Sequence, residues 1–353
     1  MLGGSREPPP VKVHLVSVDF PPERDGGVAS WAEDLGRALV GAGADVVVYT
    51  RSAPKTRAYD AALPFPVVRM VGRSWGRWQA QWVAAQVGWR LRHGDRLLFS
   101  TWPAGAILGP WAAGRGVKVG VAFHGSELTR LHAPPEALTR LLRVATACLP
   151  VSDFLSARLR ALGGRGRPVP MPAPASAELP RAEGQGLIVV ARLNPLKGVE
   201  RAVRLAAALG WPLEIVGDGP SRPRVEALVD QLGADVTLVG RRPRAEVLQR
   251  LRGKAACMLL PHAEPDGSGA EGLGLCLLEA MGQGTPAIGN ATGGVPEALG
   301  PGLLLADPDD VQGAATTIRA WLKDGGRGAE GHAWVRAHHG PERAAAAVLE
   351  ALA

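Results

Sequence analysis

Cysteine is scarce in this chain of 353 residues, which has three thiols, Cys148, Cys257 and Cys276, and no CxxC pair. Each thiol lies in or near an apolar run, so we expect buried thiols in a reducing compartment and no disulfide framework. The beginning of the chain has no apolar core followed by a cleavage site, so no signal peptide is expected. The sequence therefore favours a cytoplasmic protein.

Long hydrophobic runs are also lacking. The longest uncharged stretch, residues 97–114, is interrupted by two prolines and several glycines, so it predicts a strand, a loop and a short helix rather than a membrane span. Glycine and proline are instead abundant, at 46 and 30 residues, without a Gly-X-Y period. We expect this excess in turns and in loops where the backbone approaches a phosphate.

The charge is basic and unevenly distributed. The chain has 40 Lys and Arg against 33 Asp and Glu, a formal charge of +7. Residues 1–170 hold 22 basic and 12 acidic side chains, whereas residues 171–353 hold 18 and 21. No zinc knuckle, RRM or helix-turn-helix signature accompanies the basic half. An anionic or membrane-associated partner therefore explains the charge better than nucleic acid does.

Short apolar runs alternate with longer amphipathic ones, as in doubly wound parallel α/β sheets. In the first half we expect strands at residues 11–18, 45–50, 96–100, 117–123 and 147–151, and helices at 28–40, about 78–92 and 134–145. The alternation restarts with strands at residues 187–191, 213–216, 236–239, 256–260 and 286–288, and with helices at 199–209 and 222–232.

A proline-rich stretch separates the two series. Five prolines between residues 168 and 180 exclude a helix there and favour an extended connector. The sequence predicts two Rossmann-like domains, at 1–170 and 187–330, a linker at 171–186, and a helical segment at 331–353 that packs back on the first domain. In open α/β sheets, ligands bind beyond the carboxyl ends of the strands, so the loops that follow strands are where chemistry is expected.

The loop after the first strand contains Gly26 and Gly27, immediately before a helix. Paired glycines at a helix start let backbone N–H groups approach an anion, which the helix dipole also favours. The full GxGxxG fingerprint is absent, and an ordinary turn explains this loop equally well.

A histidine, His124, follows the expected strand at 117–123 and precedes Gly125. A side chain at a strand's carboxyl end can reach a ligand in the crevice. The alternative is a histidine that makes a structural hydrogen bond.

Two cations, Arg192 and Lys197, flank a proline turn after the expected strand at 187–191. Two positive charges beside a helix start suit a diphosphate. Lysine is rare in this chain, with six residues against 34 arginines, which makes Lys197 notable; a surface charge is the simpler alternative.

Two acids, Glu271 and Glu279, enclose the most informative segment, EGLGLCLLEAMGQGTP. Glu279 lies among apolar residues, where an unpaired carboxylate would be costly, so it needs either a structural partner or a ligand. With Glu279 two turns into a helix, the two acids would lie about 12 Å apart, enough to span a nucleotide sugar from hexose to ribose.

Six motifs, in order through most of the chain, make it resemble a retaining glycosyltransferase of family 4 with the GT-B fold. They are PPxxxGG, HGSE, VARLNPLKG, VGDGP, EGLGLCLLEAMGQGTP and GGVPE. The resemblance implies two Rossmann-like domains facing across a central cleft, the first on the acceptor side and the second binding the donor. It also implies transfer of a hexose-type sugar from a nucleotide-diphosphate sugar to a hydroxyl acceptor.

The resemblance assigns roles residue by residue. Arg192 and Lys197 would hold the diphosphate, Glu279 would accept hydrogen bonds from the ribose, and Glu271 would contact the hexose. His124 would lie near the reacting carbon. The catalytic set is His124, Arg192, Lys197 and Glu271. The donor-binding set is Gly26, Gly27, Arg192, Lys197, Gly217, Gly240, Glu271, Gly272, Leu273, Gly274, Leu275 and Glu279.

Several features of the reaction follow from the resemblance. Such enzymes usually need no metal, and no DxD-like ligand pair has a supporting context, so we expect neither metal nor cofactor. A UDP-sugar is the expected donor because it is the commonest donor of similar enzymes. A GT-B sugar-nucleotide epimerase or a non-catalytic nucleotide-sugar-binding protein is the alternative. The Asn-Gly pair and the Pro-Ser pair common in the family are here Met171-Pro172 and Pro261-His262.

The acceptor side contains a tryptophan- and arginine-rich segment at residues 73–93. Its tryptophans, Trp75, Trp78, Trp82 and Trp89, fall roughly on one helical stripe. A core-facing helix with an exposed arginine face is the simpler interpretation. The alternative is an interfacial helix that contacts an anionic bilayer at the inner face of the membrane and receives a lipid-linked acceptor.

Overall fold

The chain folds into two compact units in this computed structural model, which describes residues 10–22, 26–70, 85–179, 186–262 and 269–353. Unit 1 comprises residues 1–122, 135–149 and 344–353, and unit 2 comprises residues 123–134 and 150–343. The predicted boundary at residue 170 differs from this division, because two segments before it belong to unit 2. Unit 1 also includes the end of the chain.

Unit 1 is built on a six-stranded sheet with the order β3-β2-β1-β4-β5-β6. The strands are β1 (Lys12–Val16), β2 (Asp45–Arg51), β3 (Val67–Met70), β4 (Arg96–Phe99), β5 (Lys118–Phe123) and β6 (Ala147–Pro150). β1 is parallel to both β2 and β4, so the direction of strand progression reverses at β1.

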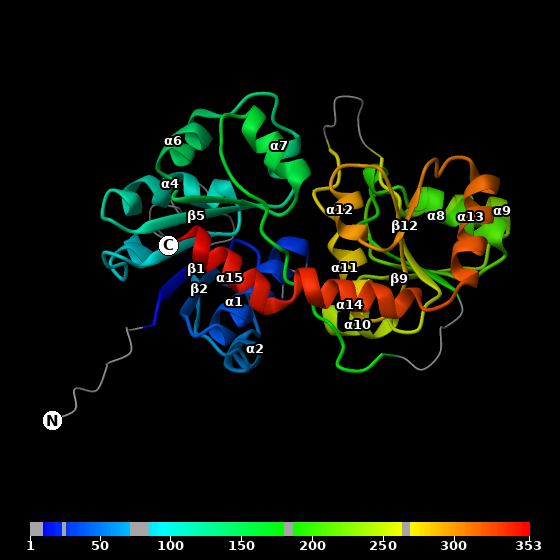
Figure 1. Cartoon of the computed structure of the whole chain (residues 1–353), viewed down its shortest axis with the longest axis horizontal. Helices are drawn as coiled ribbons and strands as arrows, with labels where there is room; N and C mark the ends of the chain where they lie inside the picture. The colour runs from blue at the N-terminus through cyan, green and yellow to red at the C-terminus, as the bar shows by residue number, and fades with distance from the viewer. Residues whose placement is uncertain (1–9, 23–25, 71–84, 180–185, 263–268) are drawn as a thin grey trace. The chain divides into compact units, whose positions relative to one another are not determined.

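Helices cover both faces of this sheet (Figure 1). They are α1 (Gly27–Gly41), α2 (Arg57–Ala61), α4 (Trp102–Ala113), α6 (Glu136–Val144) and α15 (Pro341–Ala351). Phe99 packs on α4, where a Cβ at Gly105 would lie 3.0 Å from its ring. Leu98 points to the other face, where it and Leu352 both lie within 3.0 Å of a Cβ built on Gly120. The last residues of the chain therefore pack on the sheet of unit 1.

Unit 2 has a second six-stranded sheet, with the order β12-β11-β10-β7-β8-β9. Its strands are β7 (Leu187–Val190), β8 (Leu213–Val216), β9 (Val236–Gly240), β10 (Ala256–Leu259), β11 (Ala287–Asn290) and β12 (Leu303–Leu305). Counted from β9, this is the same order as in unit 1. The reversal falls between β7 and β10, which pair in parallel.

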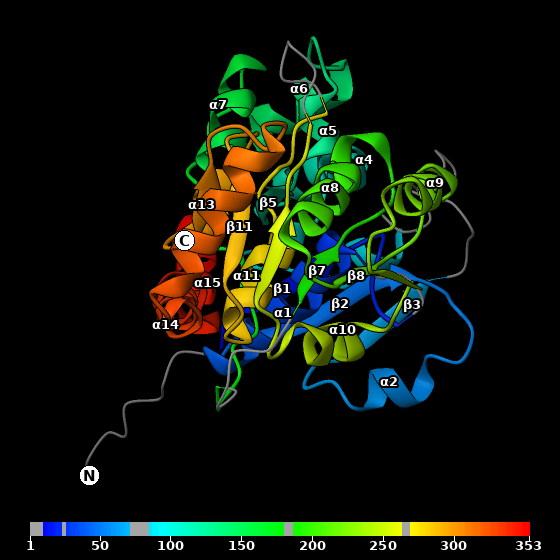
Figure 2. The same ribbon diagram turned by 90° about the vertical axis from the view of Figure 1, so that its right-hand side faces the viewer.

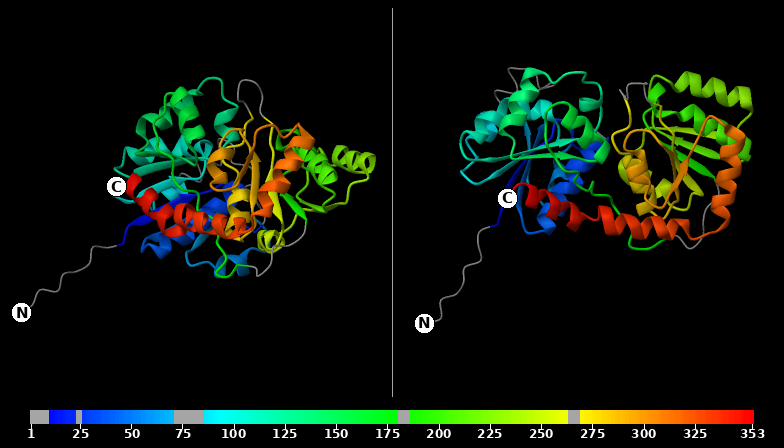
Figure 3. Two further views of the ribbon diagram at one scale, coloured as in Figure 1. Left: turned by 45° about the vertical axis from the view of Figure 1, so that its right-hand side comes forward. Right: turned by 45° about the horizontal axis from the view of Figure 1, so that its top comes forward.

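Both faces of the second sheet are covered (Figures 2 and 3). One face carries α8 (Val199–Leu209), α9 (Arg222–Leu232) and α13 (Val311–Lys323); the other carries α10 (Arg244–Leu251), α11 (Leu275–Gly282), α12 (Val295–Leu299) and α14 (Arg327–His339). Shorter helices in unit 2 are α5 (Ser126–Thr129), α7 (Asp153–Ala161) and the 3₁₀ turn η1 (Pro195–Lys197). Val203, Ile215 and Ile318 are fully buried between the sheet and the first set.

The predicted α/β class with two doubly wound sheets is confirmed, and the strands expected in both halves are present. Two strands were missed, β3 and β12, and each lies at a sheet edge. β3 follows Pro64 and Pro66, which obscure the strand pattern. The described part of the predicted linker, residues 171–179, has no helix. This segment belongs to unit 2, and its Ala173 N–H donates a hydrogen bond to the carbonyl of His339 (3.0 Å). A cleft between the domains stays a prediction.

The tryptophan-rich segment is described only in part. Trp75, Trp78 and Trp82 lie outside the described residues. Residues 85–88 are helical and Trp89 is 80% exposed. At Trp89, therefore, the core-facing interpretation is wrong.

Candidate active site

The loops after β7 and β10 meet at the strand reversal of unit 2. Gly198 brings them together: its φ is +60°, and a Cβ there would overlap the carbonyl oxygen of Leu260 at the end of β10. Only glycine satisfies both the left-handed backbone and the close approach. The two loops that carry most of the predicted site residues are therefore adjacent.

Lys197 is fixed by the turn before this glycine. The Asn194 side chain accepts a hydrogen bond from the Lys197 N–H (3.2 Å) and caps η1. Arg192 is exposed between β7 and the turn. The VARLNPLKG motif thus places both cations at the carboxyl end of β7, as its spacing predicted.

Lys197 forms an ion pair with Glu271, 74 residues further along the chain. Their side chains are 29% and 15% exposed. Burial alone would lower the pKa of Lys197, but the attraction of Glu271 and the hydrogen bond to it outweigh burial and raise that pKa. Lys197 is therefore held as a cation, and Glu271 is held close to it.

The GGVPE motif supports the backbone of Glu271. The Gly294 N–H donates to the Glu271 carbonyl (2.9 Å), and α12 begins directly afterwards. The Glu297 side chain of that helix accepts hydrogen bonds from the N–H groups at the start of α7, including Phe154 (2.9 Å). This motif therefore has a structural part in holding the loop of Glu271.

Gly272 lies against His124. A Cβ on Gly272 would overlap the His124 carbonyl oxygen, so the residue after Glu271 must be glycine for this approach. The Ser152 hydroxyl donates to the Gly272 carbonyl (2.7 Å) and accepts from the Leu155 N–H (3.2 Å). Ser152 was not predicted from the sequence, because its only signal is that of a helix N-cap.

His124 is partly exposed at the end of β5. Its N–H and that of Gly125 both donate to the Glu127 carboxylate, which fixes the backbone of the HGSE motif. The His124 backbone therefore lies against Gly272. The contact of His124 with a sugar stays a prediction.

Helix α11 starts between the two acids. Gly274 precedes it, and no side chain of the described residues caps its first turn. The N–H groups around Leu275 are therefore suited to an anion. Leu273, a predicted donor-binding residue, is buried and contributes packing.

Glu279 lies in the second turn of α11 and has a charged partner. Its side chain is 8% exposed, and its Oε1 accepts a hydrogen bond from Arg244 Nε at 2.8 Å. Arg244 is the first residue of α10 and is 21% exposed. Arg244 was not predicted from the sequence, since one arginine among 34 gives no signal.

Gly217 and Gly240 follow β8 and end β9. The Gly217 N–H donates to the Gly240 carbonyl (3.0 Å), which joins the carboxyl ends of the two strands. Both residues lie at the carboxyl ends of their strands, as Arg192 does at the end of β7. Their contact with a donor stays a prediction.

The predicted glycine loop of unit 1 is held by two arginines. Arg51 pairs with Asp19 (2.7 Å), and Arg69 donates to the Pro21 carbonyl (2.6 Å). Gly26 is the N-cap of α1 and Gly27 its first residue, and a Cβ on either would have no heavy atom of the described residues within 4 Å. This loop has room for a ligand to approach its backbone.

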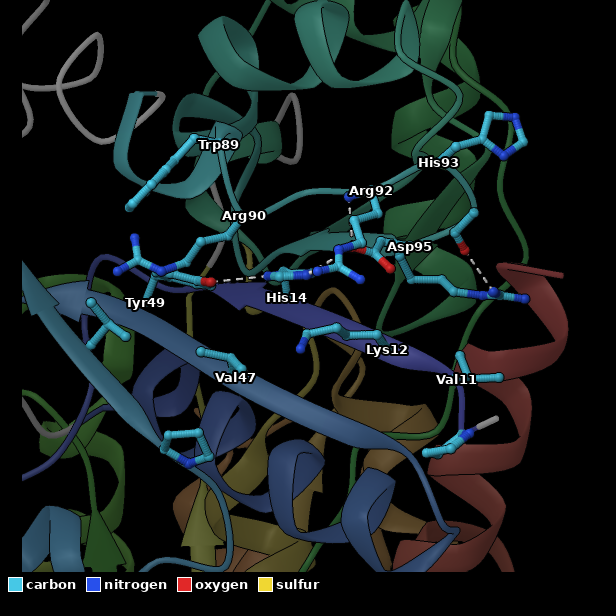
Figure 4. A pocket seen from close by; sticks show the side chains of 15 residues that line it. Val11, Lys12, His14, Val47, Tyr49, Trp89, Arg90, Arg92, His93 and Asp95 are labelled. Atoms are coloured by element: carbon cyan, nitrogen blue, oxygen red, sulfur yellow. Dashed lines mark hydrogen bonds and ion pairs between the residues drawn. The ribbon is translucent and has the colours of Figure 1, made fainter. Parts of the chain in front are cut away.

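Unit 1 also contains a cavity of about 990 Å³ on the face of β1 and β2 (Figure 4). His14 lies beneath it, 3.0 Å from the Tyr49 hydroxyl and 3.2 Å from Asp95 Oδ2. Burial raises the pKa of Tyr49 to about 12 and lowers that of His14, against the attraction of Asp95. The cavity lies near the amino-terminal ends of β1 and β4, whereas ligands of open α/β sheets bind at the other end.

Two absences hold for residues 10–22, 26–70, 85–179, 186–262 and 269–353. There, no three His, Cys, Asp or Glu side chains gather as a metal site requires. No helix of those ranges is long and apolar enough to cross a membrane. Independence from metal and cofactor, like the cytoplasmic location, stays a prediction.

Two family models match most of the chain. The model described as Glycosyltransferase Family 4 matches residues 25–171, and the model described as Glycosyl transferases group 1 matches residues 176–337. The chain belongs to this glycosyltransferase family. The resemblance inferred from six motifs is confirmed.

Several relatives of this glycosyltransferase chain are named glycosyltransferases or mannosyltransferases, in agreement with the predicted enzyme class. It is 26% identical over 361 residues to the GDP-mannose-dependent monoacylated alpha-(1-6)-phosphatidylinositol monomannoside mannosyltransferase of Corynebacterium glutamicum, with 93% of each chain covered. It is 28% identical over 222 residues to WcaL of Salmonella typhimurium, a glycosyltransferase assigned to colanic acid biosynthesis; this covers 57% of the chain and 54% of WcaL. The match thus spans about half the length of the WcaL relatives.

The fold is similar to that of Anabaena Alr3699/HepE, which was solved in complex with UDP and glucose. The TM-score is 0.73 at 16% identity, with 97% of this chain and 99% of that chain covered. At this identity the likeness concerns the fold alone, and it confirms the predicted GT-B class.

Proposed function

We propose that this chain is a retaining glycosyltransferase that moves a hexose from a nucleotide-diphosphate sugar to a hydroxyl acceptor. The observation that carries the proposal is the convergence of Lys197, Glu271 and the start of α11 at the strand reversal of unit 2. A cation, a carboxylate and uncapped helix N–H groups are the groups that a sugar diphosphate requires.

The chemistry follows from these groups. Breaking the bond from the anomeric carbon to the diphosphate leaves negative charge on the phosphate oxygens and positive charge on the sugar. Lys197, Arg192 and the N–H groups of Gly274 and Leu275 would stabilise the first charge. The acceptor oxygen would form its bond on the same face, and its proton would pass to the departing phosphate.

The other assigned residues hold the two ends of the donor. Glu279 would accept hydrogen bonds from the ribose hydroxyls, and Glu271 would accept them from the hexose. His124 would lie near the reacting carbon, and the backbone of Gly26 and Gly27 would meet phosphate or acceptor from unit 1. The Lys197–Glu271 pair would open to admit the donor, since both partners gain ligand contacts in exchange.

A UDP-sugar is the first donor to test, and GDP-mannose the second, because the relatives and the similar structure name these nucleotides. A thermal-shift panel of UDP-, GDP- and ADP-sugars should show one base with the largest rise in melting temperature. Release of that nucleoside diphosphate should then increase when an acceptor is added. Release that an acceptor never changes would favour an epimerase or hydrolase, and no shift with any donor would contradict the proposal.

The configuration of the product and the effect of a chelator test the finer points. Proton NMR of the glycoside should show the anomeric configuration of the donor. Activity should persist in EDTA, because the charge of the diphosphate is compensated by side chains and N–H groups. An inverted product or complete loss of activity in EDTA would contradict retention or metal independence, respectively.

We also propose that the acceptor is presented at an anionic membrane surface. Trp89 and Trp111 are 80% and 43% exposed, and a Cβ at Gly88 would lie 2.7 Å from the Trp111 ring, so the two segments adjoin. Arg90 and Arg115 lie over these rings, at 5.4 and 4.8 Å. Exposed tryptophan beside arginine is typical of bilayer interfaces.

Vesicle co-sedimentation tests this surface. The chain should sediment with phosphatidylglycerol vesicles at low salt, and a Trp89→Ala, Trp111→Ala double variant should bind at least several-fold more weakly. Replacement of Trp211, which lies in unit 2 beneath Arg319, is the control. Absence of binding to anionic vesicles would end the proposal and leave the transferase assignment intact.

A further inference from the structure

We propose that Arg244 is a positioning residue that holds the Glu279 carboxylate in the orientation that accepts the donor ribose. The inference rests on the proposed function, in which Glu279 binds the ribose. Arg244 itself touches neither the diphosphate nor the sugar in this scheme; it acts through Glu279.

The contact is close and shielded from solvent. Arg244 Nε lies 2.8 Å from Glu279 Oε1, and the Glu279 side chain is 8% exposed. The neighbours of Glu279 on α11, Leu278 and Ala280, are fully buried. A carboxylate in such surroundings needs a charged partner to stay ionised, and a guanidinium is the best matched one.

The pair connects two elements that approach the donor from different strands. Arg244 begins α10, directly after the loop that follows Gly240 at the end of β9. Glu279 lies on α11, which follows the loop after β10. The carboxyl end of the sheet is the ligand side, so the arginine reaches Glu279 from the side where a nucleoside is expected.

The remaining capacity of a carboxylate makes this arrangement compatible with ribose binding. A carboxylate offers about four lone-pair sites, enough for one arginine and two hydroxyls. An arginine that fixes one oxygen limits rotation of the side chain, so less conformational entropy is lost when the ribose binds. Arg244 should therefore increase affinity for nucleotides that carry ribose hydroxyls and have little effect on those without them.

The same helix supplies a matched control. Arg250 pairs with Glu214 at 2.8 Å and with Glu246, and its side chain is 33% exposed. Arg250→Ala removes the same charge from α10 and leaves Glu279 and its partner in place. Any loss that both variants share reflects charge or stability, and a loss confined to Arg244→Ala reflects the Glu279 pair.

The experiment measures binding by calorimetry of the full chain with UDP and 2′,3′-dideoxy-UDP, or with the corresponding GDP or ADP pair if the donor panel selects another base. Arg244→Ala should weaken the ribonucleotide about tenfold and the dideoxy form less than twofold. Arg244→Lys should recover part of the loss, and Arg250→Ala should bind both like the parent chain. Equal weakening of both nucleotides, or tighter binding of the ribonucleotide, would overturn the proposal.

The Glu279→Gln variant distinguishes failure of the positioning role of Arg244 from failure of the ribose-binding role of Glu279. If Glu279→Gln binds the two nucleotides with the same preference as the parent chain, the ribose role of Glu279 is wrong. If that preference is lost in Glu279→Gln and kept in Arg244→Ala, only the positioning role is wrong. In the double variant, Arg244→Ala should add no further loss of preference, since its effect passes through Glu279.

Discussion

The two sheets share one strand order but differ in how their arginines and lysines are paired. In unit 1, Arg51 and Arg69 donate to carbonyl groups of the loop after β1 and pair with aspartates of the same framework. In unit 2, Lys197 and Arg244 each pair with a glutamate that comes after β10. In both arrangements the basic side chains are less than a third exposed.

The strand order places the candidate ligand site at the carboxyl ends of the strands in both units, but the pairing of the basic residues differs between the units. A reversal of strand order creates a crevice at the carboxyl ends in either sheet. In unit 1 the two arginines donate hydrogen bonds to backbone carbonyls of the loop after β1, and these bonds hold that loop in place. In unit 2 Lys197 and Glu271 join two loops and Arg244 and Glu279 join two helices, so a ligand's phosphates and hydroxyls could contact both pairs. The same topology thus gives a supported loop in one unit and a candidate donor site in the other.

The largest effect should come from the unit 2 lysine. Lys197→Ala is expected to lower turnover about hundredfold, because it removes a cation that offsets the departing diphosphate. Steady-state release of the nucleoside diphosphate measures this, and circular dichroism should show an intact fold.

Lys254 is the matched control for that substitution. It pairs with Glu214 at 2.9 Å, and the two side chains are 22% and 16% exposed, close to the values of the Lys197 pair. Lys254→Ala should keep turnover within about twofold of the parent. Near-normal turnover of Lys197→Ala would remove its assignment, and equal losses in both variants would make the effect structural.

Glycine substitutions compare the two loops directly. Gly198→Ala should lower the free energy of unfolding of unit 2 by about 3 kcal/mol, because the new Cβ meets the Leu260 carbonyl and φ is +60°. Gly27→Ala should change that of unit 1 by about 0.5 kcal/mol or less, because the space around Gly27 is open. Urea unfolding followed by tryptophan fluorescence measures both; equal losses would contradict the difference between the loops.

The last comparison concerns a buried histidine in each unit. Burial lowers the pKa of His339 from 6.5 to about 4, although its hydrogen bond to the Met171 carbonyl opposes this. Between pH 6.5 and 4 the unfolded chain binds a proton that the folded chain does not, so stability falls as pH falls. At pH 5 the loss is about 2 kcal/mol.

Hydrogen exchange of α14 at pH 7 and pH 5, corrected for the intrinsic rate, measures this loss where it arises. His339→Gln should abolish most of the pH dependence. Burial lowers the pKa of His14 as well, but Asp95 opposes it, so exchange of β1 should change less. An unchanged pH dependence in His339→Gln would place the acid sensitivity elsewhere.

Much of this architecture was predictable because its signals are local. The alternation of short apolar runs with amphipathic segments predicted every strand of both sheets except β3 and β12. These two strands lie at sheet edges, and each is short and only partly buried. The glycines and prolines resolved into loops such as the one at Gly198. The motifs identified Lys197, Glu271 and Glu279 individually, since each lies in a segment of recognisable spacing.

Pairing was not predictable, because it depends on groups far apart in sequence. The sequence by itself determined two α/β sheets, the proline-rich connector, the family and the segments that carry charge. Only the tertiary structure decided that Lys197 faces Glu271, that Arg244 rather than another arginine faces Glu279, and that Ser152 holds the Gly272 carbonyl. The physical reason is burial: a charge at low exposure must find a partner, and which one it finds depends on how the strands and helices bring distant loops together.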